Sequence, residues 1–186
     1  GPESILVEAY VSGLPSACFT DFVYVGETRL ESVIPSIGNE EGGTQLTLTG
    51  TNFASHCKMK AQNAPIPVIV LSSTIAVCTS PPYHVGSLTL SYDCGDHVSS
   101  AVYQVTRKPE VHFIDPSQFF LAGNQPETAK VVAFTGQHFV QTNHLSCRVS
   151  NQQAQATWIS STRLLCMVKA LTAGNLTVSM SNNGAE

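Results

Sequence analysis

The segment Leu46-Thr-Leu-Thr-Gly50-Thr-Asn-Phe53 returns later in the chain as Val132-Ala-Phe-Thr-Gly136-Gln-His-Phe139. Two further segments recur, Ser73-Thr74 with Cys78 as Ser161-Thr162 with Cys166, and Gly86-Ser-Leu-Thr-Leu90 as Gly174-Asn-Leu-Thr-Val178. These two pairs share an offset of 88 positions. Anchors in the same order at a nearly constant spacing predict that the chain repeats one small domain.

The repeated segments alternate between apolar and polar residues, as in Gln45-Leu-Thr-Leu-Thr49 and Leu176-Thr-Val-Ser-Met180. Alternation places one face of a strand on a core and the other in water. Gly or Pro interrupts the chain about every ten residues, which is typical of a β-sandwich. Residues 163–171 have high helix propensity, but their repeat partner contains Pro81 and Pro82, which exclude a helix. We therefore predict strands in both copies and an all-β fold.

The copy boundaries follow from two similar closing strands, Phe22-Val-Tyr-Val25 and Ala101-Val-Tyr-Gln-Val105. One domain is predicted at residues 26–105 and the next at 106–186, where no closing strand of the second domain is seen. Residues 1–25 are predicted to be the last strands of a preceding copy, with Gly1-Pro2 as a scar of tag removal. Short linkers between copies predict a semi-rigid rod.

Composition excludes some functions and favours a protein that works outside the cell. Charged residues are 12% of the 186 residues, about half of the usual ~25%. The formal net charge of −4 lacks the basic footprint of nucleic-acid binding. No run of 18 apolar residues occurs, so no membrane span is predicted in this sequence. Asn175-Leu-Thr177 is a glycosylation sequon and fits an extracellular glycoprotein.

Six cysteines, an even number, suggest a disulfide framework: Cys18, Cys57, Cys78, Cys94, Cys147 and Cys166. Cys57 and Cys78 are 21 residues apart, and Cys147 and Cys166 are 19 apart. We expect one disulfide per copy, each stabilising by roughly 3 kcal/mol, with Cys18–Cys94 open as a third. Spacing does not decide among fifteen connectivities, and six reduced, buried thiols in a cytosolic protein are the alternative. Bridges would indicate an oxidising compartment.

These segments together resemble the IPT/TIG family of immunoglobulin-like domains. The first full copy carries Pro35, Gly42-Gly43-Thr44, Gly50 with Asn52-Phe53, Ser73-Thr74 with Cys78, and Pro81. The second keeps Pro116, Gly136 with Phe139, and Ser161-Thr162 with Cys166, but lacks the Gly-Gly-Thr turn and the trailing proline. The resemblance covers most of the chain and implies tandem immunoglobulin-like β-sandwiches. It also implies that Cys57 bridges to Cys78, as commonly occurs in the family.

The disulfide-bearing members of this family are cell-surface receptors, such as plexins, and large adhesion proteins, whereas its cytosolic members are Rel-type and related transcription factors. Tandem copies and paired cysteines place this chain with the first group. The resemblance implies a non-enzymatic segment of a receptor or adhesion ectodomain, anchored elsewhere, whose partner is another cell-surface protein. The alternatives are an intracellular dimerisation or DNA-binding module and an accessory module of a carbohydrate-active enzyme, which needs a row of exposed aromatic residues.

No residue pattern predicts catalysis, a metal or a cofactor. Cys94-x-x-His97 lacks the second pair of ligands that a structural zinc needs. Asp96 and His97 lie beside Ser99 and Ser100, but no serine sits in a nucleophile elbow. A group of four glutamates lacks the Asp-rich pattern of calcium sites and is interpreted as a solvated face: Glu27, Glu31, Glu40 and Glu41.

Partner contact is predicted at two loops of the second copy. One begins with Phe119-Phe120-Leu121, where the first copy has its short Gly-Gly-Thr turn. This longer, more apolar loop either packs on the neighbouring copy or is exposed for a partner, since exposed aromatic clusters mark interaction patches. The other is the loop from His138 to His144.

Overall fold

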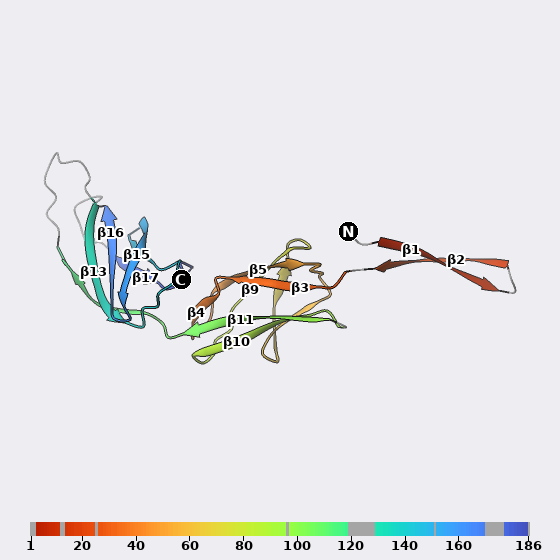
Figure 1. The fold of residues 1–186 in the computed structure, drawn as a ribbon, viewed down its shortest axis with the longest axis horizontal. Helices are drawn as coiled ribbons and strands as arrows, with labels where there is room; N and C mark the ends of the chain where they lie inside the picture. The colour runs from red at the N-terminus through yellow and green to blue at the C-terminus, as the bar shows by residue number, and fades with distance from the viewer. Residues whose placement is uncertain are drawn as a thin grey trace.

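The computed structural model describes residues 3–11, 14–24, 26–95, 97–118, 129–150, 152–169 and 177–185, the first two ranges as backbone only. Every regular element within these ranges is a β-strand, so the predicted all-β class is confirmed. Figure 1 shows a hairpin and two β-sandwiches that follow one another along the chain.

The N-terminal hairpin consists of β1 (Glu3–Val11) and β2 (Leu14–Tyr24). The two strands pair antiparallel, and their register shifts once, between Glu8 and Tyr10. In Figure 1 the hairpin extends away from the start of β3.

The first sandwich has a four-stranded sheet of order β3-β5-β9-β8 and a five-stranded sheet of order β4-β11-β10-β6-β7. Its strands are β3 (Arg29–Ile34), β4 (Ile37–Asn39), β5 (Gln45–Thr51), β6 (Lys58–Ala61), β7 (Ala64–Ile66), β8 (Val68–Val70), β9 (Ile75–Thr79), β10 (Gly86–Asp93) and β11 (Val98–Thr106). β4 pairs parallel with β11, so the chain crosses from one sheet to the other directly after β3.

The predicted alternation builds the core of this sandwich. Leu46 and Leu48 of β5 are fully buried and share one cluster with Leu88 and Leu90 of β10. The intervening threonines stay partly exposed. Burying each leucine contributes about 1.5–3 kcal/mol, and this burial fixes which face of each strand points inward.

The second sandwich is built on strands in the order β12-β13-β16-β15-β14-β17. These are β12 (Glu110–Asp115), β13 (Ala129–Gln137), β14 (Ser146–Val149), β15 (Gln152–Ser160), β16 (Arg163–Lys169) and β17 (Val178–Ser181). β15 pairs with β14 through its first half and with β16 through its second half. One long strand therefore connects the two layers, which enclose Phe134, Phe139 and Leu164.

Residues 163–169, which have high helix propensity, form strand β16 as predicted. β16 lies between β13 and β15 and pairs with both. Hydrogen bonding on both edges and burial of Leu164 and Cys166 override the local preference for helix.

The segments that define the repeat meet in space. The backbone N–H groups of Gly50 and Phe53 donate to the carbonyls of Thr74 and Ser73, at 3.1 and 2.9 Å. The second sandwich repeats both bonds, from Gly136 to Thr162 and from Phe139 to Ser161. The Gly-x-x-Phe and Ser-Thr segments are thus two halves of one structural unit.

Gly50 and Gly136 permit two strands to approach closely. A Cβ on Gly50 would lie 1.9 Å from the carbonyl oxygen of Arg29, and a Cβ on Gly136 would lie 1.9 Å from that of Glu110. In each sandwich the neighbouring strand has a register shift beside the glycine. Both glycines lie within their strands, each one residue before the strand ends.

Left-handed backbone occurs at neighbouring positions instead. Asn52 and His138 occupy equivalent places and have φ values of 56° and 62°. Asn and His tolerate this conformation better than most side chains. The predicted tight turn at Gly42 and Gly43 is confirmed, with φ values of 73° and 85°.

Two disulfides occur among the side chains that the structure describes, Cys57–Cys94 and Cys147–Cys166. The second is the pair expected from spacing. The expected Cys57–Cys78 bridge is wrong, and so is Cys18–Cys94, because Cys94 is bonded to Cys57. Cys57 and Cys94 extend the β6–β10 pairing by one step beyond Lys58↔Asp93, which brings their Cα atoms to 4.3 Å.

Cys78 has no partner cysteine because Met59 occupies the position that Cys147 has in the second sandwich. In the second sandwich Cys147 of β14 pairs with Met180 of β17, and in the first Met59 of β6 pairs with Tyr92 of β10. Both equivalences correspond to the offset of 88, so Cys147 aligns with Met59, not with Cys57. Cys78 is therefore a buried free thiol, and burial raises its pKa to about 11.

Replacing Met59 with cysteine is expected to create a second bridge in the first sandwich, to Cys78, by analogy with Cys147–Cys166. We expect the free energy of unfolding to rise by about 2–3 kcal/mol, since the new loop resembles the native one in length. Non-reducing peptide mapping and urea unfolding check this outcome. Met167→Cys, at an exposed methionine, is the control and stays unbridged. A free thiol at position 59 would refute the alignment.

Candidate functional site

The two sandwiches meet through a turn that follows β17. Asn183 is buried, with 5% of its surface exposed. Its amide Nδ2 donates to the carbonyl oxygen of Ile37 on β4, at 2.9 Å. This bond connects residues 146 positions apart and spans the junction between the sandwiches. In Figure 1 the junction lies where the end of the chain approaches β4.

The turn is held by its own side chains. Ser181 donates its hydroxyl to Asn183 Oδ1 at 2.9 Å and accepts the N–H of Gly184 at 2.8 Å. Asn183 Oδ1 also accepts the N–H of Ala185 at 3.0 Å. These bonds within the turn fix the orientation of the Asn183 amide. Its contact with the first sandwich therefore costs less conformational entropy.

The predicted loop from His138 to His144 lies against this turn. Asn182 Nδ2 donates to the carbonyl of His138 at 2.9 Å, and Asn182 Oδ1 accepts the N–H of Val140 at 3.0 Å. The Thr142 hydroxyl donates to the Asn182 carbonyl. His138 is half-buried and His144 is exposed. The backbone of this loop thus supports the junction, and partner contact through its histidines remains an expectation.

Two contacts hold the start of the connection between the sandwiches against the first sandwich. The N–H of Glu40 donates to the Thr106 carbonyl at 2.8 Å. Lys108 Nζ lies 2.7 Å from a carboxylate oxygen of Glu41, with both side chains exposed. Exposed ion pairs contribute at most about 1 kcal/mol, so the buried Asn183 contact is the more important restraint.

Replacing Asn183 with alanine is expected to loosen the junction without unfolding either sandwich. The variant loses a buried hydrogen bond and leaves the Ile37 carbonyl unsatisfied, at a cost of about 1–2 kcal/mol. Residual dipolar couplings should fit one alignment tensor for both sandwiches of the native chain and two for the variant. Asn63→Ala, at an exposed turn, should behave as the native chain. Two tensors in the native chain would contradict a fixed junction.

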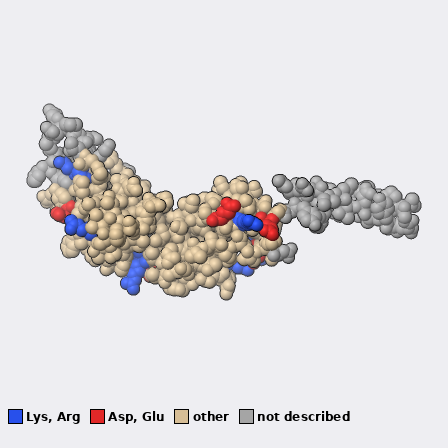
Figure 2. All heavy atoms as spheres, in the orientation of Figure 1, with Lys and Arg blue, Asp and Glu red and all other residues tan. Residues whose placement is uncertain are grey.

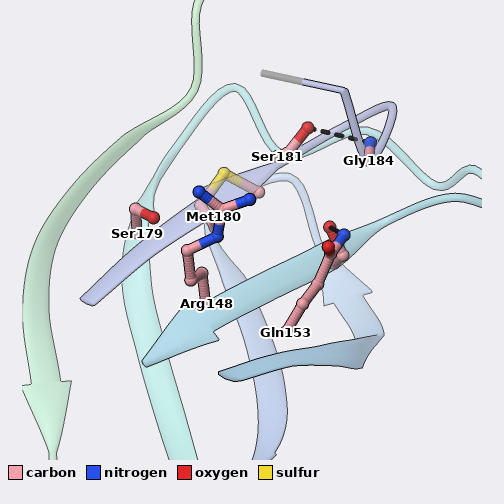
Figure 3. Close-up of a pocket in the computed structure, with 7 residues that line it drawn as sticks. Arg148, Gln153, Ser179, Met180, Ser181 and Gly184 are labelled. Atoms are coloured by element: carbon pink, nitrogen blue, oxygen red, sulfur yellow. Dashed lines mark hydrogen bonds between the residues drawn. The ribbon is translucent and has the colours of Figure 1, made fainter. Parts of the chain in front are cut away.

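A second feature is a shallow polar depression, open to solvent, on the outer face of the β15-β14-β17 layer (Figure 3). Its lining consists mainly of hydroxyl, amide and guanidinium groups, from Ser146, Arg148, Gln153, Ser179, Met180, Ser181 and Gly184. The depression lies beside the turn that forms the junction.

A third feature is an apolar row across the outer face of the β3-β5-β9-β8 sheet. Ile34 pairs with Thr47, Thr47 pairs with Val77, and Val77 pairs with Ile69. Ile34 and Ile69 are 51% and 64% exposed. Figure 2 shows charged side chains in only a few small groups on the visible face of the molecule. The row contains no charge, so contacts to it would be apolar.

Several residues considered for metal binding or catalysis have other partners in the structure, and Asp96 lies outside the described residues. No metal-binding group of three His, Cys, Asp or Glu side chains occurs in the described part of the chain. Cys94 is consumed in a disulfide and cannot ligate zinc as a thiolate. Ser99 accepts the N–H of Leu30, and Ser100 bonds Ser91, at 2.8 and 2.9 Å. His97 Nε2 lies 3.9 Å from Glu27.

The predicted acidic group is divided between the two ends of the first sandwich. Glu27 precedes β3 and contacts Arg29 and His97, whereas Glu41 follows β4 and contacts Lys108. Three other predicted positions lie outside the described residues, as does the sequon: Phe119, Phe120, Leu121 and Asn175. No helix that could cross a membrane occurs within the described ranges.

Two face-packed sheets in each of two consecutive units define a tandem immunoglobulin-like β-sandwich protein. The family described as IPT/TIG domain matches residues 29–108 and again 109–186. The chain therefore belongs to the IPT/TIG family, which confirms the resemblance found in its sequence.

Among curated proteins, Fibrocystin-L from Homo sapiens is 22% identical over 189 residues, which cover 96% of this chain and 4% of that protein. Among solved structures, the Plexin A4 full extracellular region matches with a TM-score of 0.58 and 20% identity, covering 92% of this chain and 15% of that one. The likeness to the plexin establishes the fold. This chain spans only a small part of either relative.

Proposed function

We propose that this chain is a non-enzymatic segment of a cell-surface receptor or adhesion ectodomain that spaces its neighbouring domains and contacts another protein. The observation that carries the proposal is a pair of IPT/TIG sandwiches, each with its own disulfide, joined through the buried Asn183. Disulfides favour an oxidising compartment. The fold of the Plexin A4 extracellular region supports the same assignment.

The spacing role rests on the junction. A short connection alone would permit bending, but the Asn183–Ile37 hydrogen bond joins the two sandwiches directly, and the Glu41–Lys108 pair holds the connection against the first sandwich. In this proposal β1 and β2 are the last two strands of a preceding copy within residues 1–25, and the domains are 26–105 and 106–186. β1 and β2 pair antiparallel, as β10 and β11 do, and this likeness supports the assignment of β1 and β2 to a preceding copy.

The contact role is assigned to the apolar row on β3, β5, β9 and β8. Its partner is a protein surface that is itself uncharged and aliphatic, since the row offers Ile34, Val77 and Ile69 between threonines and no charged group. Burial of such side chains contributes roughly 25 cal/mol per Å². Binding is therefore expected to depend little on salt.

Binding of the purified chain to intact cells, measured by flow cytometry at low and high salt, tests the proposal. Ile69→Asp should abolish binding because it places a charge in the row. Val102→Asp is the matched control, since Val102 is 62% exposed on the opposite sheet. Equal loss with both variants, or binding that disappears at high salt, would contradict an apolar contact at this row.

Two alternatives have distinct signatures. An intracellular module requires reduced thiols, so free Cys57, Cys94, Cys147 and Cys166 in protein isolated from its native source would overturn the extracellular assignment. An accessory module that binds neutral polysaccharide by ring stacking requires an exposed aromatic row. The single Trp158 instead packs on the core and donates its indole N–H to the carbonyl of Phe139 at 3.2 Å.

A further inference from the structure

The polar depression is built from two cross-strand rows on the outer face of the second sandwich. Arg148 of β14 lies between Ser179 of β17 and Gln153 of β15. Ser146 lies beside Ser181 in the adjacent row. Ser146 and Ser181 are 8% and 5% exposed, so the floor consists of buried hydroxyls. Figure 3 shows these side chains around the depression, with the turn at Gly184 at one end.

The depression carries a cation to which the described residues supply no neighbouring anion. No carboxylate of the described residues lies within 4.0 Å of the Arg148 guanidinium. The guanidinium has five N–H donors in a planar fork that matches a carboxylate. Gln153 uses one amide N–H for Ser146 Oγ at 3.1 Å, which leaves its second N–H and its carbonyl for a ligand.

The first sandwich shows what normally compensates a cation at this position. Lys60 is equivalent to Arg148, and its Nζ lies 2.6 Å from a carboxylate oxygen of Asp93. The hydrogen bond from Lys60 lowers the pKa of Asp93 below its usual value. In the second sandwich Ser181 replaces Asp93. The cation is thus retained while its internal carboxylate is lost, and an external carboxylate can take that place.

The charge of the whole sandwich points in the same direction. Residues 106–186 contain six Lys or Arg and four Asp or Glu. Residues 26–105 contain three Lys or Arg and six Asp or Glu. The formal charges are therefore +2 and −3. An anionic ligand is steered toward the second sandwich and away from the first, although the chain as a whole is acidic.

We propose that this depression binds a carboxylate-bearing sugar, such as a hexuronic acid at the end of an acidic glycan. The depression is shallow and open to solvent, so the ligand lies against its surface and is not enclosed as in pockets for drug-sized ligands. Arg148 pairs with the carboxylate, and Gln153 and Ser179 bond the hydroxyls of the ring. A sugar ring presents both groups at once. Met180 supplies the one apolar wall.

Titration of the ¹⁵N-labelled chain with glucuronate, glucose, acetate and tetraglutamate tests the proposal. Glucuronate should shift the backbone amide signals of Ser146, Gln153 and Ser179, and it should bind more tightly than glucose or acetate. Arg148→Gln should weaken the affinity for glucuronate by about tenfold or more, and Gln153→Ala should weaken this affinity less. Arg163→Gln, at an exposed arginine of the same sandwich, is the control for net charge and should bind as the native chain does.

Three results would overturn the assignment. Equal loss with Arg163→Gln would indicate general charge attraction. If glucuronate bound no more tightly than acetate, the sugar ring would not be recognised. Tetraglutamate tighter than glucuronate would identify an acidic peptide as the ligand. Because the depression and the apolar row lie on different sandwiches, each of these results leaves the proposed protein contact untouched.

Discussion

Gly50→Ala is expected to destabilise the first sandwich by about 3–4 kcal/mol, a large part of the stability of a small domain. The added methyl would lie 1.9 Å from the Arg29 carbonyl oxygen and 2.8 Å from Cζ of Phe53. The nearest of these atoms is backbone and cannot rotate away. β3 must therefore separate from β5, which breaks ladder hydrogen bonds and displaces the buried Phe53.

Urea unfolding followed by domain-resolved hydrogen exchange measures this effect. Gly136→Ala should produce the same loss in the second sandwich alone, because Glu110 and Phe139 take the places of Arg29 and Phe53. Gly43→Ala is the control: its φ is +85°, but a Cβ there meets no atom within 4 Å. Strain without a clash should cost about 1 kcal/mol. Similar losses at Gly50 and Gly43 would refute the close-approach explanation.

Removal of the Cys147–Cys166 disulfide is expected to cost about 3 kcal/mol. The double variant with alanine at both positions frees a loop of 19 residues in the unfolded chain, and the chain-entropy estimate for that length is about 3 kcal/mol. Removing Cys57–Cys94, with a separation of 37, should cost slightly more. Each double variant should affect only its own sandwich, as measured by urea unfolding without reductant.

Cys78→Ala is the matched control for the first sandwich, since it removes a buried sulfur that forms no bridge. We expect a loss of about 1 kcal/mol, from packing alone. If this variant destabilised the first sandwich as much as the Cys57 and Cys94 double variant, Cys78 would have to be disulfide-bonded, and the connectivity described above would be wrong.

Most of the fold could be predicted because its signals are local. Alternation in Leu46–Leu48 and in Leu88–Leu90 specifies strands with one buried face. The offset of 88 between the Ser73 and Ser161 segments specifies two copies. The local preference of residues 163–169 is for helix. The repeat corrected it, because the equivalent segment of the first copy contains Pro81 and Pro82, which exclude a helix.

The disulfides show where local signals fail. The similar spacings of Cys57–Cys78 and Cys147–Cys166 suggested equivalent bridges. Cys147 aligns with Met59, however, and Cys57 lies two residues before Met59 on the same face, where it bonds to Cys94. Cys57 and Cys147 are 90 positions apart, whereas the flanking segments are 88 apart. That discrepancy is the signal by which the pairing with Cys94 could have been found.

The candidate sites were less accessible to sequence reasoning. Asn183 follows a predicted strand without a distinguishing pattern, and its partner Ile37 is 146 positions away. The depression at Arg148 requires knowledge of which residues on β14, β15 and β17 share a row. His138 attracted attention as a histidine, but the structure uses its left-handed backbone and its carbonyl.

Sequence by itself determined the strands, the two copies and the family, because periodicity and repeated short segments act over a few residues. Only the tertiary structure decided which sulfurs bond, why Gly50 has no side chain, how Asn183 joins the sandwiches and that no described acid pairs with Arg148. The reason is physical: each of these depends on strand register and on contact between segments far apart in the chain, which no local pattern encodes.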